Sequence, residues 1–191
     1  MEEKLIGQLR AGDMNAYREL VSRFSGKIYN TALGLLQDKE DAEDMTQEVF
    51  IEIFQSISGF QERSKLSTWI YRITVRKSLE LIRSRNRKKR KGVFLSLFGK
   101  EDHLPVTSSS PFYHPGIKLE NKERAAVLFM AIEKLPVNQR TAFTLHKVEN
   151  LSYAELAEIM EITVSSVESL MFRAKQNLRK ILGSYYDQNE K

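Results

Sequence analysis

Residues 151–175 read LSYAELAEIMEITVSSVESLMFRAK, and this stretch decides the fold of the C-terminal part of the chain. Ser152 and Glu155 have the spacing of a capping box, which predicts that a helix starts there. A short turn at residues 161–162 follows, and Thr163 then predicts the cap of a second helix. Two short helices joined by such a turn are typical of a helix-turn-helix motif.

The second predicted helix has two different faces. A buried stripe at helical spacing is expected from Val164, Val167, Leu170 and Met171. The opposite face is polar and carries Ser165, Ser166, Ser169 and Arg173. A polar helical face of this size fits the major groove of DNA. A helical hairpin with the same caps can also be an ordinary packed unit, so the motif alone leaves both interpretations open.

An acidic helix is predicted near the other end of the chain, over residues 38–55. Asp38 stands where its N-cap should lie, as Asp13 does for the preceding helix. Its expected buried stripe consists of Ala42, Met45, Val49 and Ile53. The remaining face is rich in carboxylates, so it repels DNA and indicates either a solvated surface or a basic or polar protein partner.

Aromatic residues precede a dense basic cluster in the next predicted helix, which begins near residues 67–68. Phe60, Trp69 and Tyr71 come first, and seven of the nine residues in 83–91 are Lys or Arg. Proteins use this combination to stack bases and neutralise phosphates. The helical spacing of Trp69 with Ile73 favours a core residue over a base platform, so the cations are the safer indication of nucleic-acid binding.

The chain divides into two small helical domains, and the fold class is all-α because no strand-like alternation of useful length occurs. Residues 92–118 contain three of the four prolines and a run of serines, which predicts a linker. The domains are therefore expected over 1–91 and 119–185. The apolar stretch 93–98 either packs onto a domain or a partner, or continues the basic helix.

Composition limits the chemistry of this 191-residue chain, which has a formal net charge of +5. It has no cysteine, so disulfides and thiolate ligands are excluded. His103 and His114 fall in the linker and His146 stands alone, so neither a catalytic nor a metal site is predicted. No glycine-rich phosphate loop, cofactor motif, signal peptide or membrane span is present, which favours a cytoplasmic protein that is not an enzyme.

Four segments resemble the sigma-70 family of RNA polymerase sigma factors, within it the extracytoplasmic-function (ECF) subfamily. Residues 41–50 (DAEDMTQEVF) look like region 2.2, and residues 66–73 (LSTWIYRI) look like the start of region 2.4. Residues 133–143 (EKLPVNQRTAF) and the helix-turn-helix resemble regions 4.1 and 4.2. The resemblance implies a region 2 helical bundle followed by a region 4 helix-turn-helix domain.

By this resemblance the chain binds core RNA polymerase and directs it to promoters, without a small-molecule substrate. The beta-prime clamp helices would be held by Asp41, Asp44, Gln47 and Glu48. The −10 element would be met by Phe60, Arg63, Lys65, Trp69, Arg72, Arg76 and Arg83. The −35 element would be met by Ser165, Ser166, Glu168, Ser169, Phe172, Arg173 and Lys175. Region 4 would also contact the beta flap, and an anti-sigma protein, often attached to the membrane, would control the factor.

Three residues depart from those common in the family: Arg76, Glu168 and Leu170. The promoter sequence is therefore not carried over from better-known members. The alternative function is that of a helix-turn-helix regulator whose N-terminal domain dimerises or senses a ligand. The acidic helix and the segment 66–73 favour the sigma factor.

Overall fold

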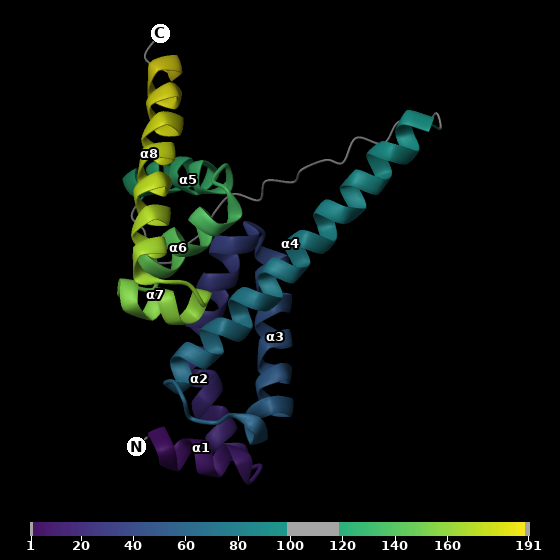
Figure 1. The fold of residues 1–191 in the computed structure, drawn as a ribbon, viewed down its shortest axis with the longest axis vertical. Helices are drawn as coiled ribbons and strands as arrows, with labels where there is room; N and C mark the ends of the chain where they lie inside the picture. The colour runs from purple at the N-terminus through teal and green to yellow at the C-terminus, as the bar shows by residue number, and fades with distance from the viewer. Residues whose placement is uncertain (1, 99–118, 190–191) are drawn as a thin grey trace.

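The computed structural model describes residues 2–98 and 119–189, and every regular element within these ranges is helical (Figure 1). The predicted all-α class is thus confirmed. The N-terminal elements are α1 (Glu2–Arg10), α2 (Met14–Leu36), α3 (Lys39–Ser56), the short 3₁₀ helix η1 (Ile57–Gly59) and α4 (Leu66–Phe98). The C-terminal elements are α5 (Leu119–Glu133), α6 (Val137–Lys147), α7 (Tyr153–Met160) and α8 (Val164–Asn189).

The first domain is a bundle in which α2, α3 and α4 pack around one core, with α1 across their lower end (Figure 1). Asp13 caps α2 by accepting a hydrogen bond from Asn15, and Asp38 caps α3 by accepting one from Asp41, as predicted. The predicted stripe of α3 is buried and consists of Ala42, Met45, Val49 and Ile53. The local sequence therefore sets both the start of these helices and the face that they bury.

Helix α4 is longer than predicted. The basic cluster was expected to end the helix near residue 91, but the backbone remains helical to Phe98. The alternative that residues 93–98 continue the basic helix is therefore the one that the backbone adopts. The prolines and serines of the predicted linker, together with His103 and His114, lie outside the described residues.

The second domain is built from α5 to α8. Helix α5 starts at Leu119, where the sequence predicts that helical periodicity returns. Its apolar face packs on the middle of α8, with Ala131, Ile132 and Leu135 meeting Ala174 and Leu178. A second cluster joins α6, α7 and the first turns of α8, and its buried members are at most 5% exposed.

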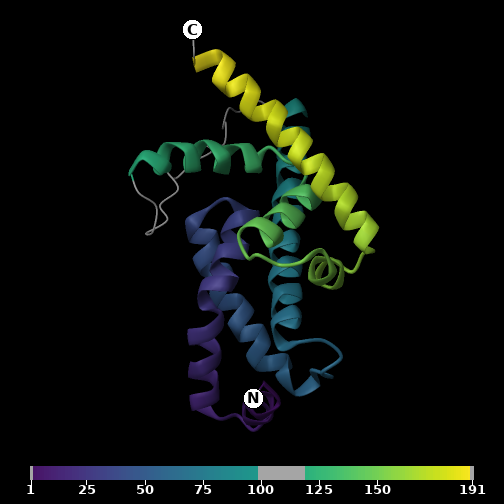
Figure 2. The same ribbon diagram turned by 90° about the vertical axis from the view of Figure 1, so that its left-hand side faces the viewer.

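The two domains pack directly on each other, and Figure 2 shows α6 and α7 lying against α2 and α4. Leu35, Tyr71 and Val75 of the first domain belong to the same buried cluster as α6, α7 and α8. Gly34 permits the close approach of α2 and α6, because a Cβ there would lie 2.9 Å from Oγ1 of Thr144 and closer still to its Cγ2. The described domains thus form one closed body.

Candidate polymerase and nucleic-acid interfaces

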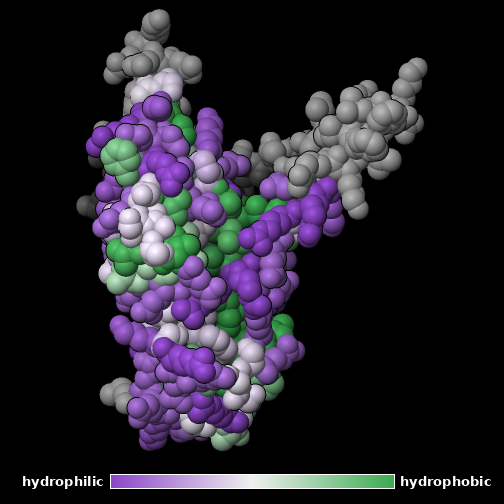
Figure 3. All heavy atoms as spheres, in the orientation of Figure 1, coloured by the Kyte–Doolittle hydropathy of each residue, from purple (hydrophilic) through white to green (hydrophobic). Residues whose placement is uncertain are grey.

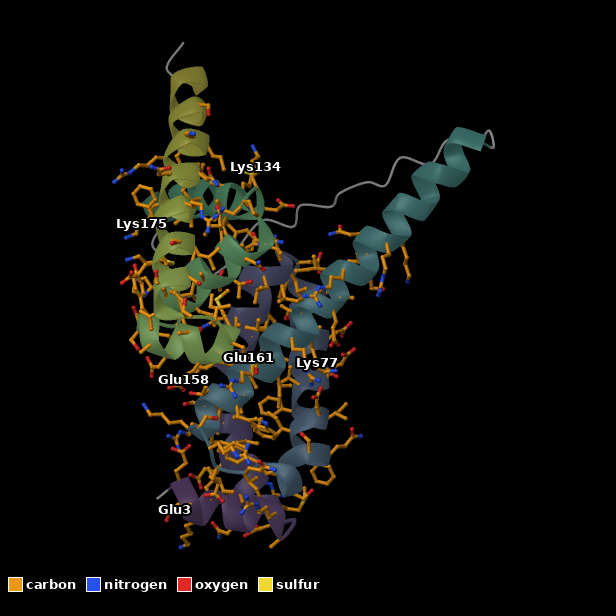
Figure 4. All side chains as sticks on the ribbon, viewed as in Figure 1. Glu3, Lys77, Lys134, Glu158, Glu161 and Lys175 are labelled. Atoms are coloured by element: carbon orange, nitrogen blue, oxygen red, sulfur yellow. The ribbon has the colours of Figure 1, made fainter. Side chains whose placement is uncertain are left out.

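The carboxylates of α3 fall into two groups, and one group is neutralised by α4. Arg85 donates two hydrogen bonds to the Asp41 carboxylate in a two-point ion pair, and these bonds raise the pKa of the guanidinium. Lys77 Nζ lies 3.2 Å from Glu48 and 3.6 Å from Glu52, and Figure 4 labels Lys77 on α4 beside α3. Part of the acidic face therefore holds α3 to α4, and the Asp41 carboxylate is engaged in an ion pair within the chain.

The other group points away from α4. It consists of Asp44 and Gln47, which are exposed. Glu48 pairs with Lys77 of α4, but its side chain is still 58% exposed. Two apolar side chains lie on the outer surface of the same helix, with Ile51 and Phe54 both 57% exposed. The ring of Phe54 packs on Tyr17 of α2, with 4.8 Å between ring centroids. The sequence analysis missed Ile51 and Phe54, although their spacing from Asp44 and Gln47 already placed them on the outer face.

The predicted −10 residues occupy the loop after η1 and the first turns of α4. Arg63 and Lys65 are exposed in the loop, whereas Phe60 is buried and packs on the half-buried Trp69 at 4.9 Å between centroids. Phe60 is therefore a core residue in this structure, and Trp69 is half-buried against it. The remaining three cations follow along α4 at Arg72, Arg76 and Arg83.

The predicted helix-turn-helix has the expected caps. Ser152 and Glu155 form the capping box of α7, and these hydrogen bonds lower the pKa of Glu155. Thr163 Oγ1 accepts a hydrogen bond from the Ser166 amide at the start of α8. The prediction that Val164 is buried was wrong: it is the first residue of α8 and is 44% exposed.

All seven predicted −35 residues are exposed along the first half of α8, and Lys175 points away from the helix bundle (Figure 4). They are Ser165, Ser166, Glu168, Ser169, Phe172, Arg173 and Lys175. Phe172 is 62% exposed, the highest exposure among the large hydrophobic side chains described. An exposed aromatic among short polar residues can contact the methyl group of thymine while its neighbours bind base edges.

Some of the residues predicted to contact DNA in the two domains line one cleft of about 1030 Å³. Arg72, Arg76 and Arg83 lie on its α4 side, and Ser166 and Arg173 lie on its α8 side. Apolar surface is visible between the C-terminal helices and α4 (Figure 3), where Ile73, Val75, Leu79 and Leu170 contribute to the lining. Glu161 caps the C-terminal end of α7 and also lines this cleft; Figure 4 labels it beside α4.

Polar contacts fasten the domains beside this cleft. The Tyr71 hydroxyl donates a hydrogen bond to Glu149 at 2.7 Å, and the Arg72 guanidinium donates one to the Glu158 carbonyl at 2.9 Å. Burial raises the pKa of Glu149, opposed by the hydrogen bond from Tyr71 and by the charge of Lys27. Lys65 also lies 3.7 Å from Glu155. Two predicted −10 residues, Lys65 and Arg72, thus make polar contacts with the second domain.

Within the described residues, no group of three or more potential ligands lies together as a metal site. No helix in that part of the chain is both long and apolar enough to cross a membrane. The His146 Nδ1–H donates a hydrogen bond to the Leu151 carbonyl at 2.8 Å, which ties α6 to the loop before α7. The fold and its surfaces define a helical protein of two domains, with a helix-turn-helix in the second.

Comparison with known proteins identifies both domains. The chain matches the family "Sigma-70 region 2" over residues 20–88 and "Sigma-70, region 4" over residues 125–178. The ECF RNA polymerase sigma factor SigW of Bacillus subtilis is 32% identical over 95% of this chain and 97% of its own length. RNA polymerase sigma-H factor of Pseudomonas aeruginosa is 28% identical over 95% of this chain and 93% of its own.

Two solved structures share the fold. CnrH, in complex with the cytosolic domain of CnrY, superposes with a TM-score of 0.68 at 20% identity, covering 96% of this chain and 97% of that one. The sigma factor RpoE of Bartonella quintana, in complex with the anti-sigma factor NepR, gives 0.65 at 19% identity over 87% and 96%. At these identities the likeness concerns the fold.

The chain belongs to the sigma-70 family of RNA polymerase sigma factors, in the ECF subfamily. Its function is promoter-specific initiation of transcription. The relatives are sigma factors, which are not enzymes. A regulator with an unrelated sensing domain is not favoured, because the region 2 match covers the N-terminal half.

Proposed function

We propose that the chain uses three separate surfaces in initiation. The outer face of α3, with Asp44, Gln47 and Glu48, binds the beta-prime clamp helices of core RNA polymerase. The loop 61–65 and the cations of α4 meet the −10 element, and the exposed face of α8 reads the −35 element. The observation that carries this assignment is that charged or polar side chains are exposed on each surface, with the exposed apolar side chains Ile51 and Phe54 beside them on α3 and Phe172 beside them on α8.

The apolar residues of α3 extend the polymerase surface. Ile51 and Phe54 continue the line of Asp44 and Gln47, and exposed apolar groups rimmed by charge are typical of protein interfaces. An acidic rim selects a partner with basic residues, whereas the apolar centre supplies binding free energy when water is excluded. The same surface repels DNA, so it keeps the polymerase contact distinct from the promoter contacts.

Initiation requires the two domains to separate. A recognition helix must enter a groove about 12 Å wide in a duplex whose single turn is about 34 Å long. The cleft of about 1030 Å³ between α4 and α8 cannot admit such a duplex. We infer that the closed arrangement is the resting form, and that binding to polymerase favours an open form in which both DNA surfaces are accessible.

The functional regions follow from these surfaces. The domain of residues 1–91 binds the polymerase and the −10 element, and the domain of residues 119–185 binds the −35 element and the beta flap. Residues 92–118 link the two domains. The chain itself catalyses no reaction and works in the cytoplasm, where the polymerase is. Since the solved sigma factor RpoE is bound by an anti-sigma factor, an anti-sigma protein that holds the closed form is the expected regulator.

Substitutions on two surfaces, measured separately, test these assignments. Asp44→Arg should weaken binding to core polymerase, with Glu19→Arg on the exposed side of α2 as a matched charge change. Arg173→Ala should leave core binding intact and weaken run-off transcription from promoters selected from a library, with Arg179→Ala of the same helix as control. The assignments fail if each variant behaves like its control.

A further inference from the structure

Helix α1 lies across the end of the first domain, where it reaches both sides of the loop 61–65. Leu5, Ile6 and Leu9 are buried in the same core as Phe60 and Leu66, which flank that loop. One side of α1 is therefore fixed by packing. Its first residue and its last residue both make polar contacts with the loop or its flanks.

Glu2 supplies the cap that α4 lacks in its own sequence. The first amides of a helix need acceptors from outside the helix. Lys65 precedes Leu66 at the start of α4, and a lysine side chain has no acceptor. The Glu2 carboxylate instead accepts the Leu66 amide hydrogen at 2.6 Å, across 64 positions of sequence. A negative charge at this helix end is also favoured by the helix dipole.

Arg10 holds the other end of the loop. Its guanidinium donates a hydrogen bond to the Phe60 carbonyl and lies 2.8 Å from the Glu62 carboxylate. Glu62 has a backbone φ of 56°, in the left-handed region that residues other than glycine rarely adopt. This conformation is unfavourable in a free loop, so the contact with Arg10 favours the shape that the loop has here.

The rigid helix α1 sets the spacing between the Glu2 contact and the Arg10 contact. Nine residues of helix place Glu2 and Arg10 about 12 Å apart along the axis. Between the two anchored flanks, Arg63 and Lys65 remain exposed, although Lys65 also lies 3.7 Å from Glu155 of the second domain. A loop that is already ordered loses less conformational entropy when it binds a flexible single strand.

We propose that α1 is a brace that preorganises the loop 61–65 for single-stranded DNA of the −10 element, with Glu2 and Arg10 as its positioning residues. The inference rests on the proposed role of this loop in promoter binding. Neither residue touches DNA in this scheme. Their contribution is the shape of the loop and the fixed start of α4, which carries the next cations.

The test compares neighbouring residues of one helix. Glu2→Ala removes the cap, whereas Glu3→Ala removes an exposed carboxylate from the outer side of α1 (Figure 4). Glu2→Gln keeps an acceptor oxygen and should restore most of the effect. Arg10→Ala removes the second contact. Each variant is assembled with core polymerase and titrated with a labelled single strand that carries the −10 non-template sequence of a promoter selected by run-off transcription.

A second readout follows the loop without DNA. Trp69 is the only tryptophan of the chain, and it packs on Phe60 at the end of the loop. Its quenching by acrylamide and the hydrogen exchange of the Leu66 amide should both increase in Glu2→Ala and Arg10→Ala. The affinity of the holoenzyme for the single strand should fall about fivefold to tenfold, a range set by the loss of one helix cap. Core binding should stay at the level of Glu3→Ala.

The variant Arg63→Ala/Lys65→Ala separates failure of the inference from failure of the proposed function. If this variant loses affinity for the strand while Glu2→Ala and Arg10→Ala match Glu3→Ala, the brace is overturned and the role of the loop stands. If the double variant also binds like wild type, the loop does not bind the −10 strand and both proposals fall. An equal loss of core binding in Glu2→Ala would show a general structural role and overturn the inference.

Discussion

The carboxyl group of Glu149 connects the arrangement of the domains to pH. It lies at the end of α6, half-buried between the domains, and accepts a hydrogen bond from Tyr71 of α4. Burial raises its pKa above the ordinary value of 4.5, while the Tyr71 hydrogen bond, Lys27 and Asn30 act in the opposite direction. The closed form therefore holds a proton at a pH where an open or unfolded chain has released it.

From this shift we predict that the closed form becomes less stable as pH rises. The contribution of Glu149 is fully present below 4.5 and is lost as pH increases through the raised pKa. Glu149→Gln keeps an acceptor for Tyr71 but cannot ionise, so its free energy of unfolding relative to wild type should increase across this window and stay constant above it. Urea unfolding between pH 4 and pH 8 measures the difference. A difference that is constant with pH would contradict the assignment.

Phe54 is the residue whose exposure the proposed polymerase surface explains. Phe54→Ala should weaken binding to core polymerase about tenfold, the scale of an aromatic residue near the centre of an interface. Because the side chain is 57% exposed, the free energy of unfolding should change little. Leu128→Ala, at 39% exposure on α5, is the control. Equal polymerase affinities for the two variants would remove Phe54 from the interface.

Among the helices, α2 contributes both to the core of the first domain and to the contact between the two domains. One side of it packs in the first core, and Leu35 and Gly34 meet the second domain. Gly34 lies in the last turn of α2, and glycine within a helix costs up to about 1 kcal/mol relative to alanine. Its close approach to Thr144 gives that cost a structural reason.

We predict that Gly34→Ala opens the molecule. The methyl group improves helix propensity by about 1 kcal/mol, but it overpacks the contact with Thr144 at a cost of about 1–3 kcal/mol. The radius of gyration from small-angle X-ray scattering should therefore increase. Gly26→Ala in the same helix has no atom within 4 Å of the added Cβ and should leave it unchanged. The close packing of α2 on α6 would be disproved by equal scattering from both variants.

The sequence predicts those parts of the elements that depend on near neighbours. The caps at Asp13, Asp38 and Thr163 are correct because cap and amide lie within three residues. The exposure of Val164 was missed because helical spacing does not say where the partner helix ends. Likewise, Tyr71 and Glu149 are 78 positions apart, and no local pattern brings them together.

The whole molecule differs from its parts in one respect: closing the domains hides surfaces that each domain alone would expose. The predicted −10 and −35 residues were separately deducible from the two segments, but their meeting in one cleft was not. That cleft depends on a domain contact rather than on any motif. The proposed switch between closed and open forms is therefore a property of the complete chain.

A reversible covalent lock provides the strictest test of that switch. A Cβ at position 34 would lie 3.2 Å from the Cβ of Thr144, a few tenths of an ångström below the usual disulfide range of about 3.5–4.5 Å. Because the chain has no cysteine of its own, Gly34→Cys/Thr144→Cys introduces a unique pair. We predict that the oxidised variant loses run-off transcription at least tenfold and recovers it after reduction, since a closed molecule cannot accommodate duplex DNA between α4 and α8. Each single-cysteine variant controls for the substitutions, and full activity of the oxidised, verified disulfide form would mean that initiation proceeds without separation of the domains.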